Sequence, residues 1–454
     1  MVCGGFIAVS WLARRLGGSA AEAVCGIAEC EHFLLSDKHF AEDYGLPVRG
    51  NTMTEAPEVA LPFRRDPSCP FNPAKEISHL RAEEPVSRFT LPSGHPAWLI
   101  TRHADVRAIL GDNRFTTAVN PITLLRASEE DSTVEEPPTP PGMFAAMNPP
   151  EHTRLRRMVA GEFGVKRMER LRPKVEAIVN QHLDAMAQAG STVELLDAFA
   201  RPITAMVICE LLGAPIEDHE DVQRRARGAV DGDIDMEEGL ALFLEGQKYM
   251  AELIAKQRAN PGSAMLGMLI REHADNLTDE ELVGISNLLL SAGHEATANM
   301  MAMAVVLLLQ HPDQAAVIRD QPEVTEQAVE EMLRYVSISF TTLIRTASED
   351  VTVSGTEIKA GDYVFVHLPS ANRDESRYAN ADVFDITRNP EQHLAFGHGI
   401  HHCIGASLAR MQLRIALPAL LRGFPTLRLA VPFEELSFRP MGNVMGIDDV
   451  PVTW

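Results

Sequence analysis

The chain has 454 residues, of which 45% are hydrophobic, so it can bury a large core as one big domain or as about two to three smaller ones. Its formal net charge of -22 argues against a nucleic-acid-binding protein, because binding to phosphates depends on Lys and Arg. Six cysteines are scattered without a CxxC pair, as expected of reduced thiols in a reducing compartment. Composition therefore favours a soluble, cytoplasmic protein.

Residues 1–52 differ from the rest of the chain, since they hold three of the six cysteines and show no strand pattern. An apolar run at residues 2–12 is too short to cross a membrane, and Arg14 and Arg15 follow it, whereas a secretory signal has its basic residues first. We expect residues 1–52 to be an extension of unknown role, which a misassigned start site would explain, and residues 53–454 to form a single domain.

Short elements and one long loop open this domain. Residues 98–101 predict a strand, and residues 103–110 predict a short helix. Residues 127–150 are rich in Glu, Pro and Thr, so they predict a loop rather than a regular element. A loop of this length in a compact domain is usually functional or mobile.

Long amphipathic helices are predicted in the middle of the chain, for instance at residues 173–188 and 238–257. The next helix begins near Thr278, because Thr278 and Glu281 fit a capping box, and it runs to about Gln310.

This last helix bears on the fold class. Residues 282–309 have the length of a membrane span, but His294 and Glu295 lie in the middle, which favours a buried helix of a soluble protein. Strand patterns cluster late, at residues 351–353 and 363–367 and in the C-terminal tail. We therefore predict a mainly α fold with a small β portion.

The densest chemical signal is the sequence HLAFGHGIHHCIGASLARMQ at residues 393–412. Gly397, Gly399 and Gly405 surround Cys403, and an apolar helical pattern begins just after it. Cys403 is therefore expected at or just before a helix N-terminus, where free N–H groups and the helix dipole favour a thiolate. The glycines would let backbone N–H groups approach the sulfur and let a flat ligand lie close to the chain.

Three interpretations of this cysteine compete. A lone cysteine is most often a buried structural residue. A zinc site would use His398, His401, His402 and Cys403, but no second Cys/His cluster lies nearby in the sequence. The third interpretation is an axial ligand of haem iron.

The pattern Phe396-x-x-Gly399-x-His401-x-Cys403-x-Gly405 resembles the signature of the cytochrome P450 family and matches it at every fixed position. The resemblance implies the cytochrome P450 fold, a single large haem-binding domain, and haem b (iron protoporphyrin IX) with Cys403 as the ligand of the metal. It also implies that Phe396 packs beside the ligand loop and that His401 donates to a haem propionate. A thiolate ligand donates electron density that favours O–O cleavage.

Glu331 and Arg334 stand three residues apart on a predicted helix. Taken alone, they would be a routine surface ion pair of little consequence. The resemblance instead implies a buried pair that shapes the core near the cysteine loop, joined by a third basic residue. Arg388 resembles that partner, and Arg373 is the other candidate.

His152 and Arg156 stand four residues apart in a helix expected after Pro150, so both can face one side. An exposed basic helix face is the simpler explanation. By resemblance they are haem propionate ligands, and Arg345, on a strand after the Glu331 helix, is a third. Two donors one turn apart suit a carboxylate.

Basic residues are concentrated between residues 154 and 174 in an otherwise acidic protein. A solvated helix face is as credible as the alternative that the resemblance implies, a docking patch for an acidic electron donor. No flavin or ferredoxin domain follows Cys403 in the sequence, so the expected donors are a separate ferredoxin and ferredoxin reductase. No nucleic acid and no membrane are expected as partners.

The long apolar helix carries Ala292, Gly293 and Glu295 in the sequence AGHEAT. One interpretation is a helix with a polar edge in solvent, but a carboxylate among apolar turns is costly unless it is satisfied or used. Gly293 weakens the helix and would leave a groove for dioxygen. The segment resembles the family motif in which an acid followed by a threonine delivers protons to the dioxygen being activated.

This motif departs from the family pattern at one position. Ala296 stands where the threonine is usual, and Thr297 points about 100° away round the helix. We hypothesise that an ordered water, or a hydroxyl on the substrate, completes the proton path with Glu295.

The resemblance implies a monooxygenase that most often hydroxylates or epoxidises a small molecule. A mainly apolar pocket is expected from residues 115–148, 289–296 and 339–343 together with Val444 and Met445, which suits a mid-sized apolar substrate in natural-product tailoring. Oxidation of foreign compounds is an alternative, and a haem-binding sensor or carrier without turnover is another.

Overall fold

The structure is a computed structural model that describes residues 65–66, 68–91, 94–117, 139–230, 236–339, 343–439 and 444–454. The predicted extension at residues 1–52 and residues 127–138 of the predicted loop lie outside the described residues, as do residues 340–342 of the expected pocket.

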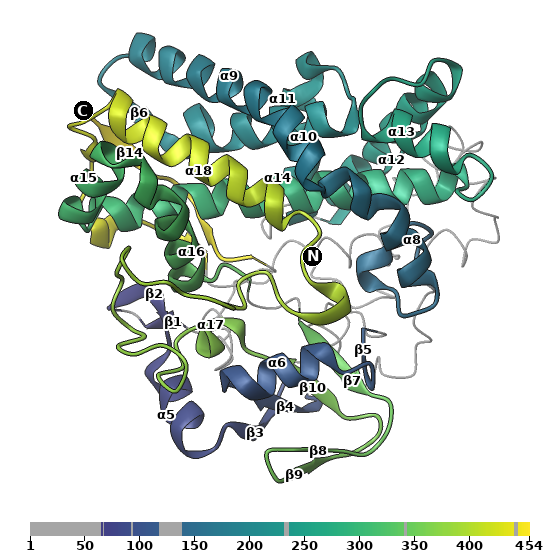
Figure 1. The fold of residues 1–454 in the computed structure, drawn as a ribbon, viewed down its shortest axis with the longest axis vertical. Helices are drawn as coiled ribbons and strands as arrows, with labels where there is room; N and C mark the ends of the chain where they lie inside the picture. The colour runs from purple at the N-terminus through teal and green to yellow at the C-terminus, as the bar shows by residue number, and fades with distance from the viewer. Residues whose placement is uncertain are drawn as a thin grey trace, which may run out of the picture.

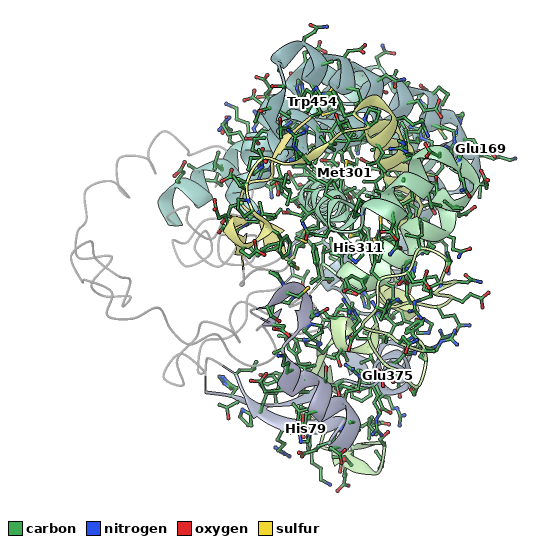
Figure 2. All side chains as sticks on the ribbon, turned by 90° about the vertical axis from the view of Figure 1, so that its left-hand side faces the viewer. His79, Glu169, Met301, His311, Glu375 and Trp454 are labelled. Atoms are coloured by element: carbon green, nitrogen blue, oxygen red, sulfur yellow. The ribbon has the colours of Figure 1, made fainter. Side chains whose placement is uncertain are left out.

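Helices fill one part of the molecule and the main sheet fills the other (Figure 1). Figure 2 shows Met301 inside the helical part, whereas His79 lies at the far end, in the sheet part. The helices are α5 (Lys75–Glu83), α6 (His103–Gly111), α8 (Glu151–Ala160), α9 (Val165–Ala189), α10 (Arg201–Leu212), α11 (His219–Val230), α12 (Met236–Ala259), α13 (Met265–His273), α14 (Asp279–Leu309), α15 (Pro312–Asp320), α16 (Thr325–Val336), α17 (Leu368–Ala371) and α18 (Ala406–Gly423).

Helix α14 is the longest of these, and the sequence marks both of its ends. The Thr278 hydroxyl accepts from the N–H of Glu281 at 3.2 Å, and the Glu281 carboxylate accepts from the N–H of Thr278 at 3.1 Å, which confirms the capping box. Within the described residues, α14 is the one helix that is long and apolar enough to cross a membrane, but 78% of its most apolar window is buried in the protein. It is therefore the core helix that His294 and Glu295 in its middle predict.

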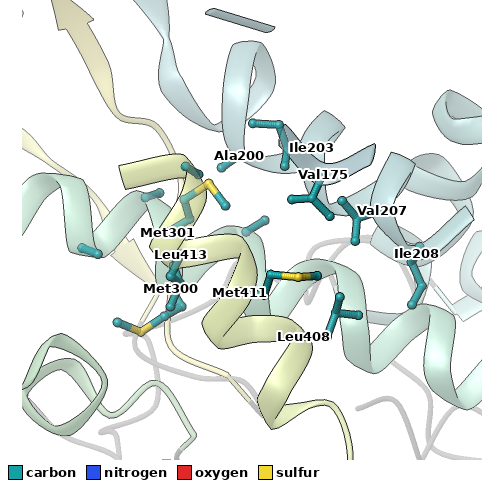
Figure 3. Close-up of a cluster of buried hydrophobic side chains, with 14 of the residues drawn as sticks. Val175, Ala200, Ile203, Val207, Ile208, Met300, Met301, Leu408, Met411 and Leu413 are labelled. Atoms are coloured by element: carbon teal, nitrogen blue, oxygen red, sulfur yellow. The ribbon is translucent and has the colours of Figure 1, made fainter. Parts of the chain in front are cut away.

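The core of the helical part lies where α9, α10, α14 and α18 meet (Figure 3). Each helix presents an apolar face there, because its branched and sulfur-containing side chains recur at helical spacing. Apolar burial of this kind is the main stabilising contribution to the fold. The buried side chains drawn at this junction include Val175, Ile203, Val207, Met300, Met301, Leu408, Met411 and Leu413.

The main sheet has five strands in the order β3-β4-β10-β7-β5. Strand β10 runs parallel to β4 and antiparallel to β7, with Val364 paired to Trp98 on one side and to Arg345 on the other. This pairing places Arg345 on an interior strand of the sheet, between β10 and β5. The strands are β3 (Val86–Thr90), β4 (Pro96–Ile100), β5 (Phe115–Thr116), β7 (Ile344–Ala347) and β10 (Tyr363–Val366).

Smaller sheets and single turns complete the fold. Strand β14 lies between β11 and β6, and the other short strands pair as β1-β2, β8-β9 and β12-β13. Their bounds are β1 (Arg65–Asp66), β2 (Cys69–Pro73), β6 (Thr192–Glu194), β8 (Val351–Val353), β9 (Thr356–Ile358), β11 (Arg428–Leu429), β12 (Phe438–Arg439), β13 (Gly446–Ile447) and β14 (Pro451–Thr453). The short turns are η3 (Phe144–Ala146), η4 (Gly161–Phe163), η5 (Leu196–Ala200), η6 (Ile216–Asp218), η7 (Pro322–Val324), η8 (Gly399–His401) and η9 (Phe433–Glu435).

The structure confirms the predicted elements that it describes. The strand expected at 351–353 is β8, and that at 363–367 is β10, one residue shorter. The helix expected at 103–110 is α6, and the two helices expected in the middle of the chain lie within the longer α9 and α12. The fold is therefore mainly α with a small β portion, as predicted.

Candidate active site

The cysteine loop runs from Phe396 to Gly405 and leads into α18, which begins at Ala406. The N–H of Cys403 donates to the carbonyl of Phe396 at 2.9 Å, which closes the loop. Gly397 and Gly399 both have positive φ, of 69° and 73°, so the loop needs residues without a Cβ at these turns.

Gly399 is also needed for a close approach to α6. A Cβ at this position would lie 2.0 Å from the carbonyl oxygen of Leu110, near the end of that helix. No side chain fits such a distance, so Gly399 lets the cysteine loop sit directly on the backbone of α6.

The Cys403 thiol has exposed surface, yet burial is the largest influence on it and raises its pKa above the usual value. The N–H groups of Gly405 and Ala406 lower the pKa, as do Arg156 and Arg410, but they do not outweigh burial. The helix terminus alone thus does not create the thiolate that the sequence predicts, whereas a coordinating metal ion would.

Four predicted propionate-binding side chains converge beside this loop. The rings of His152 and His401 lie with their centroids 4.2 Å apart, and the guanidinium of Arg156 donates to the carbonyl of His402. Burial, together with Arg345, His152 and Arg156, lowers the pKa of His401 to about 3. His401 therefore lies within electrostatic range of the other three basic groups.

This cluster lacks an anion among the described residues, because no ion pair there joins any of its four side chains to a carboxylate. Arg345 is 4% exposed, and burial lowers its pKa to about 10. His152 is 2% exposed, and neither of its ring nitrogens has a hydrogen-bond partner within the described part of the chain. Buried cations and unpaired donors of this kind fit a ligand that brings carboxylates, as haem does.

The middle of α14 provides a second surface that fits a flat ligand. Between Gly284 and Leu308, the residues with accessible surface are Ala292, Gly293 and Ala296. They stand at positions i, i+1 and i+4, on one side of the helix. All are small, so they leave room beside an otherwise buried helix.

Glu295 belongs to a buried polar cluster between α14 and α10. Its carboxylate lies 3.8 Å from Arg201 Nε and 3.5 Å from His294 Nε2, and it accepts from Asn299 Nδ2 at 3.1 Å. His294 Nδ1 lies 2.8 Å from the hydroxyl of Thr204. Glu295 is 4% exposed, so the polar edge of the helix does not face solvent.

Gly293 has a packing role that the sequence did not reveal. Helix α14 continues unbroken through it, and a Cβ there would lie 3.0 Å from Ile208 Cδ1 on α10. Thr297 is buried, whereas Ala296 is partly accessible, so the two differ in direction as predicted. The accessible strip therefore presents a methyl group where the family pattern has a hydroxyl.

Glu331 and Arg334 form the buried pair that the resemblance implies, since both are 0% exposed. Arg334 donates to the two oxygens of Glu331 at 2.7 and 2.8 Å, and Arg388 donates to the same carboxylate at 3.1 Å. Arg373 is not the third partner, because it stacks on Tyr335 at 3.6 Å.

Asn372 connects this ion pair to the segment that leads into the cysteine loop. Its carbonyl accepts from Arg334 at 2.7 Å, and its side-chain oxygen accepts from the N–H of Leu394 at 2.7 Å. Sequence analysis missed this link, because an isolated Asn in a loop has many uses.

Two further expectations concern charge and metals. In the basic stretch from 154 to 174, four side chains pair with carboxylates: Arg154, Arg167, Arg172 and Lys174. Much of its charge is therefore neutralised within the protein.

Zinc is not supported, because the described residues hold no group of three or more Cys, His, Asp or Glu side chains arranged to bind a metal.

The expected pocket segments that the structure describes also meet. Ser339 forms a β-bridge with Val444, and the N–H of Met445 donates to the carbonyl of Ile338 at 2.7 Å. Asn299 joins them to α14, since its side-chain oxygen accepts from the N–H of Ile447 at 3.2 Å.

Comparisons with a family model, with curated proteins and with solved structures all point to one family. The model of the family described as cytochrome P450 matches residues 246–430. Cytochrome P450-SU2 of Streptomyces griseolus is 40% identical over 398 residues, which cover 87% of this chain and 97% of that protein. Nocardicin C N-oxygenase of Nocardia uniformis subsp. tsuyamanensis is 39% identical over 407 residues, which cover 88% of this chain and 100% of that protein.

A solved structure extends the similarity to the fold. The crystal structure of CYP105P1 in complex with filipin I is 39% identical, with a TM-score of 0.79, and the match covers 85% of this chain and 97% of that one. Identity of this level over nearly whole relatives shows common descent. The chain belongs to the cytochrome P450 family and is a haem b monooxygenase that acts on small molecules.

Proposed function

We propose that Cys403 is the thiolate ligand of the haem iron and that the protein hydroxylates or epoxidises a mid-sized, mainly apolar molecule in natural-product tailoring. The observation that carries the ligand assignment is the cluster of four basic side chains beside the Cys403 loop, without a carboxylate among the described residues. When bound, haem supplies the iron that activates dioxygen with electrons from separate proteins.

The basic cluster would hold the two propionates. Arg156, Arg345, His152 and His401 would donate to them, and the carboxylates would in turn stabilise the buried guanidinium of Arg345. Phe396 flanks the ligand loop. Gly399 lets the loop lie on the backbone of α6, and Gly405 keeps the backbone after Cys403 close to the sulfur. A Cβ at Gly405 would lie 3.9 Å from Cys403 Sγ, so the sulfur and this turn are in close contact.

Glu295 donates and accepts protons during dioxygen activation. It lies beside the accessible strip formed by Ala292, Gly293 and Ala296. Its ion pair with Arg201 is long, at 3.8 Å, so a small side-chain movement is enough to change its partner. Because Ala296 has no hydroxyl, an ordered water or a hydroxyl on the substrate completes the path. Thr297 lies on another side of the helix and does not replace it.

Two relatives support a natural-product substrate by what their names say of them. One is a nocardicin C N-oxygenase, and the other was crystallised with filipin I. The described pocket segments near Ser339, Val444 and Met445 suit a mainly apolar ligand.

Electrons come from a ferredoxin and its reductase in the cytoplasm. Arg157, Lys166 and Arg170 remain exposed in the basic stretch and provide a positive surface for an acidic donor. Reduced thiols support this compartment, because Cys69, Cys209 and Cys403 are all free.

The reduced, CO-bound absorption spectrum tests the ligand. We expect the red-shifted band of thiolate-ligated haem in the wild type and its loss in Cys403→Ser, while Cys69→Ser, a matched control, keeps it. A wild type without this band would refute the Cys403 assignment. Turnover with added ferredoxin and reductase then tests the donors, and substrate-induced spectral shifts across a natural-product library identify the ligand class.

A further inference from the structure

A cluster of charged side chains lies between α16 and α18, on the approach to the cysteine loop. Glu330 of α16 accepts from Arg410 Nε at 2.8 and 3.0 Å and from Arg410 Nη2 at 2.8 Å. Arg414 Nη2 donates to the same carboxylate at 2.9 Å, and His393 Nε2 lies 2.9 Å from it.

The hydrogen-bond contacts of His393 indicate its tautomer. The N–H of Ala395 donates to His393 Nδ1 at 3.2 Å, so Nδ1 is the acceptor and Nε2 carries the proton toward Glu330. Glu330 therefore accepts hydrogen bonds from three side chains, those of Arg410, Arg414 and His393. Partial burial acts to raise the pKa of Glu330, but the hydrogen bonds from His393 and Arg410 outweigh it and lower the pKa to about 2.

This arrangement fixes Arg410 over an aromatic ring. The guanidinium carbon of Arg410 lies 4.5 Å from the centroid of Phe396, within the range of a cation–π contact. Phe396 in turn accepts the hydrogen bond from the N–H of Cys403. Arg410 is also one of the cations that act to lower the pKa of Cys403. One residue thus separates a fixed positive charge from the sulfur.

We propose that Arg410 is a positioning residue that acts through Phe396 on the Cys403 thiolate, and that Glu330 holds Arg410 in place. The fixed charge withdraws electron density from the sulfur and so raises the reduction potential of the bound haem. This inference rests on the proposed role of Cys403 as the iron ligand. A plain salt bridge between two helices would instead affect stability alone.

Helix α18 offers a matched comparison. Arg414 lies one turn beyond Arg410, donates to the same carboxylate and is equally exposed, with 27% of each side chain accessible. It also pairs with Glu326 at 2.8 Å rather than stacking on Phe396. Arg414→Gln therefore removes the same charge from the same cluster without touching the ring.

The measurement is the reduction potential of the haem-loaded protein, determined by spectroelectrochemistry. We expect a clearly more negative potential for Arg410→Gln than for Arg414→Gln, because Coulomb effects weaken with distance and solvent. Arg410→Lys, which keeps the charge but not the planar stack, should fall between wild type and Arg410→Gln. Arg410→Lys also provides the test if the Arg410→Gln protein does not fold.

The role of Glu330 is tested by a double-mutant cycle. Glu330→Gln should change the potential in the wild type and have a much smaller effect in the Arg410→Gln background, because it acts through Arg410. Equal effects in both backgrounds would overturn the holding role of Glu330. Equal shifts for the two arginine variants, or lost stability without any shift, would overturn the role of Arg410.

A wrong assignment of Cys403 as the iron ligand would give a different experimental result. If Cys403 is not the ligand, the wild type itself lacks the thiolate band in its reduced, CO-bound spectrum, before any variant is compared.

Discussion

Two buried glutamates on neighbouring helices, Glu331 on α16 and Glu295 on α14, differ in how well their charges are satisfied. Both are almost fully buried, at 0% and 4% exposure. Glu331 receives two hydrogen bonds from Arg334, at 2.7 and 2.8 Å, and another from Arg388 at 3.1 Å. Glu295 has its nearest cation, Arg201, at 3.8 Å.

The difference fits a structural role for Glu331 and the proton-transfer role that we propose for Glu295. A buried charge is tolerated only when its partners compensate for the lost hydration. Glu331 has that compensation in full, because two arginines donate three hydrogen bonds to its carboxylate. Glu295 has only a long ion pair with Arg201, at 3.8 Å, beside an accessible strip of α14, and this suits the proton-transfer role proposed for it.

The largest expected effect is that of Glu331→Gln on stability. Removing this charge leaves Arg334 and the partly buried Arg388 without their anion, which typically costs about 3–5 kcal/mol. That is a large share of a domain's total stability. Denaturant unfolding of the haem-loaded protein measures the free energy of unfolding.

Glu326→Gln is the matched control on the same helix. Glu326 is 73% exposed and pairs with Arg414, and such surface pairs contribute about 0–1 kcal/mol. Similar losses for both variants would mean that burial of the Glu331 cluster does not distinguish it.

Glu295→Gln should show the opposite pattern, with slow turnover and nearly unchanged stability. Arg201 keeps its 2.7 Å bond to Asp197, so it is not left unpaired. Loss of a positioned acid or base lowers the rate by about 100-fold at the low end of its usual range. The rate of product formation with donor proteins measures this change.

Ser286→Ala removes another buried polar group from α14, outside the expected pocket segment at residues 289–296, where the Ser286 hydroxyl donates to the carbonyl of Leu282 at 2.6 Å. It should leave turnover almost unchanged. A Glu295→Gln enzyme as fast as this control would remove Glu295 from the proton path.

The same contrast shows what the sequence can predict. Local signals predicted α14 from Thr278 and Glu281, the loop around Cys403 and the spacing of Glu331 and Arg334. Contacts between distant segments were beyond it, because they depend on how helices and strands pack. The pairing of Glu295 with Arg201 and the stacking of Arg410 on Phe396 are of this second kind.

The basic cluster extends the comparison to a cation that lacks an anion within the described residues. Arg345→Gln should weaken haem binding by about 10-fold, the value of one charge-assisted hydrogen bond, without destabilising the haem-free protein. Stability of the haem-free protein should not fall, because burial disfavours the charge of Arg345 when no anion is bound. Haem titration and unfolding of the haem-free protein measure the two effects.

Arg88→Gln is the control in the same sheet, since Arg88 stacks on Trp98 at 4.1 Å and its side chain is 56% exposed. It should leave haem affinity unchanged. A haem-free Arg345→Gln protein that is clearly less stable than wild type would show that Arg345 supports the fold rather than the ligand.

The smallest expected effect comes from restoring the missing alcohol with Ala296→Thr. If a water or a substrate hydroxyl now completes the path from Glu295, a hydroxyl fixed on the helix replaces it, and the gain is at most one net hydrogen bond. About 1 kcal/mol corresponds to about a fivefold change in the fraction of electrons that reach product. Thr297→Ala should not change this fraction, because Thr297 is buried on another side of α14. If neither variant changes the coupling of electrons to product and Glu295→Ala does not either, then no proton relay operates at this part of α14.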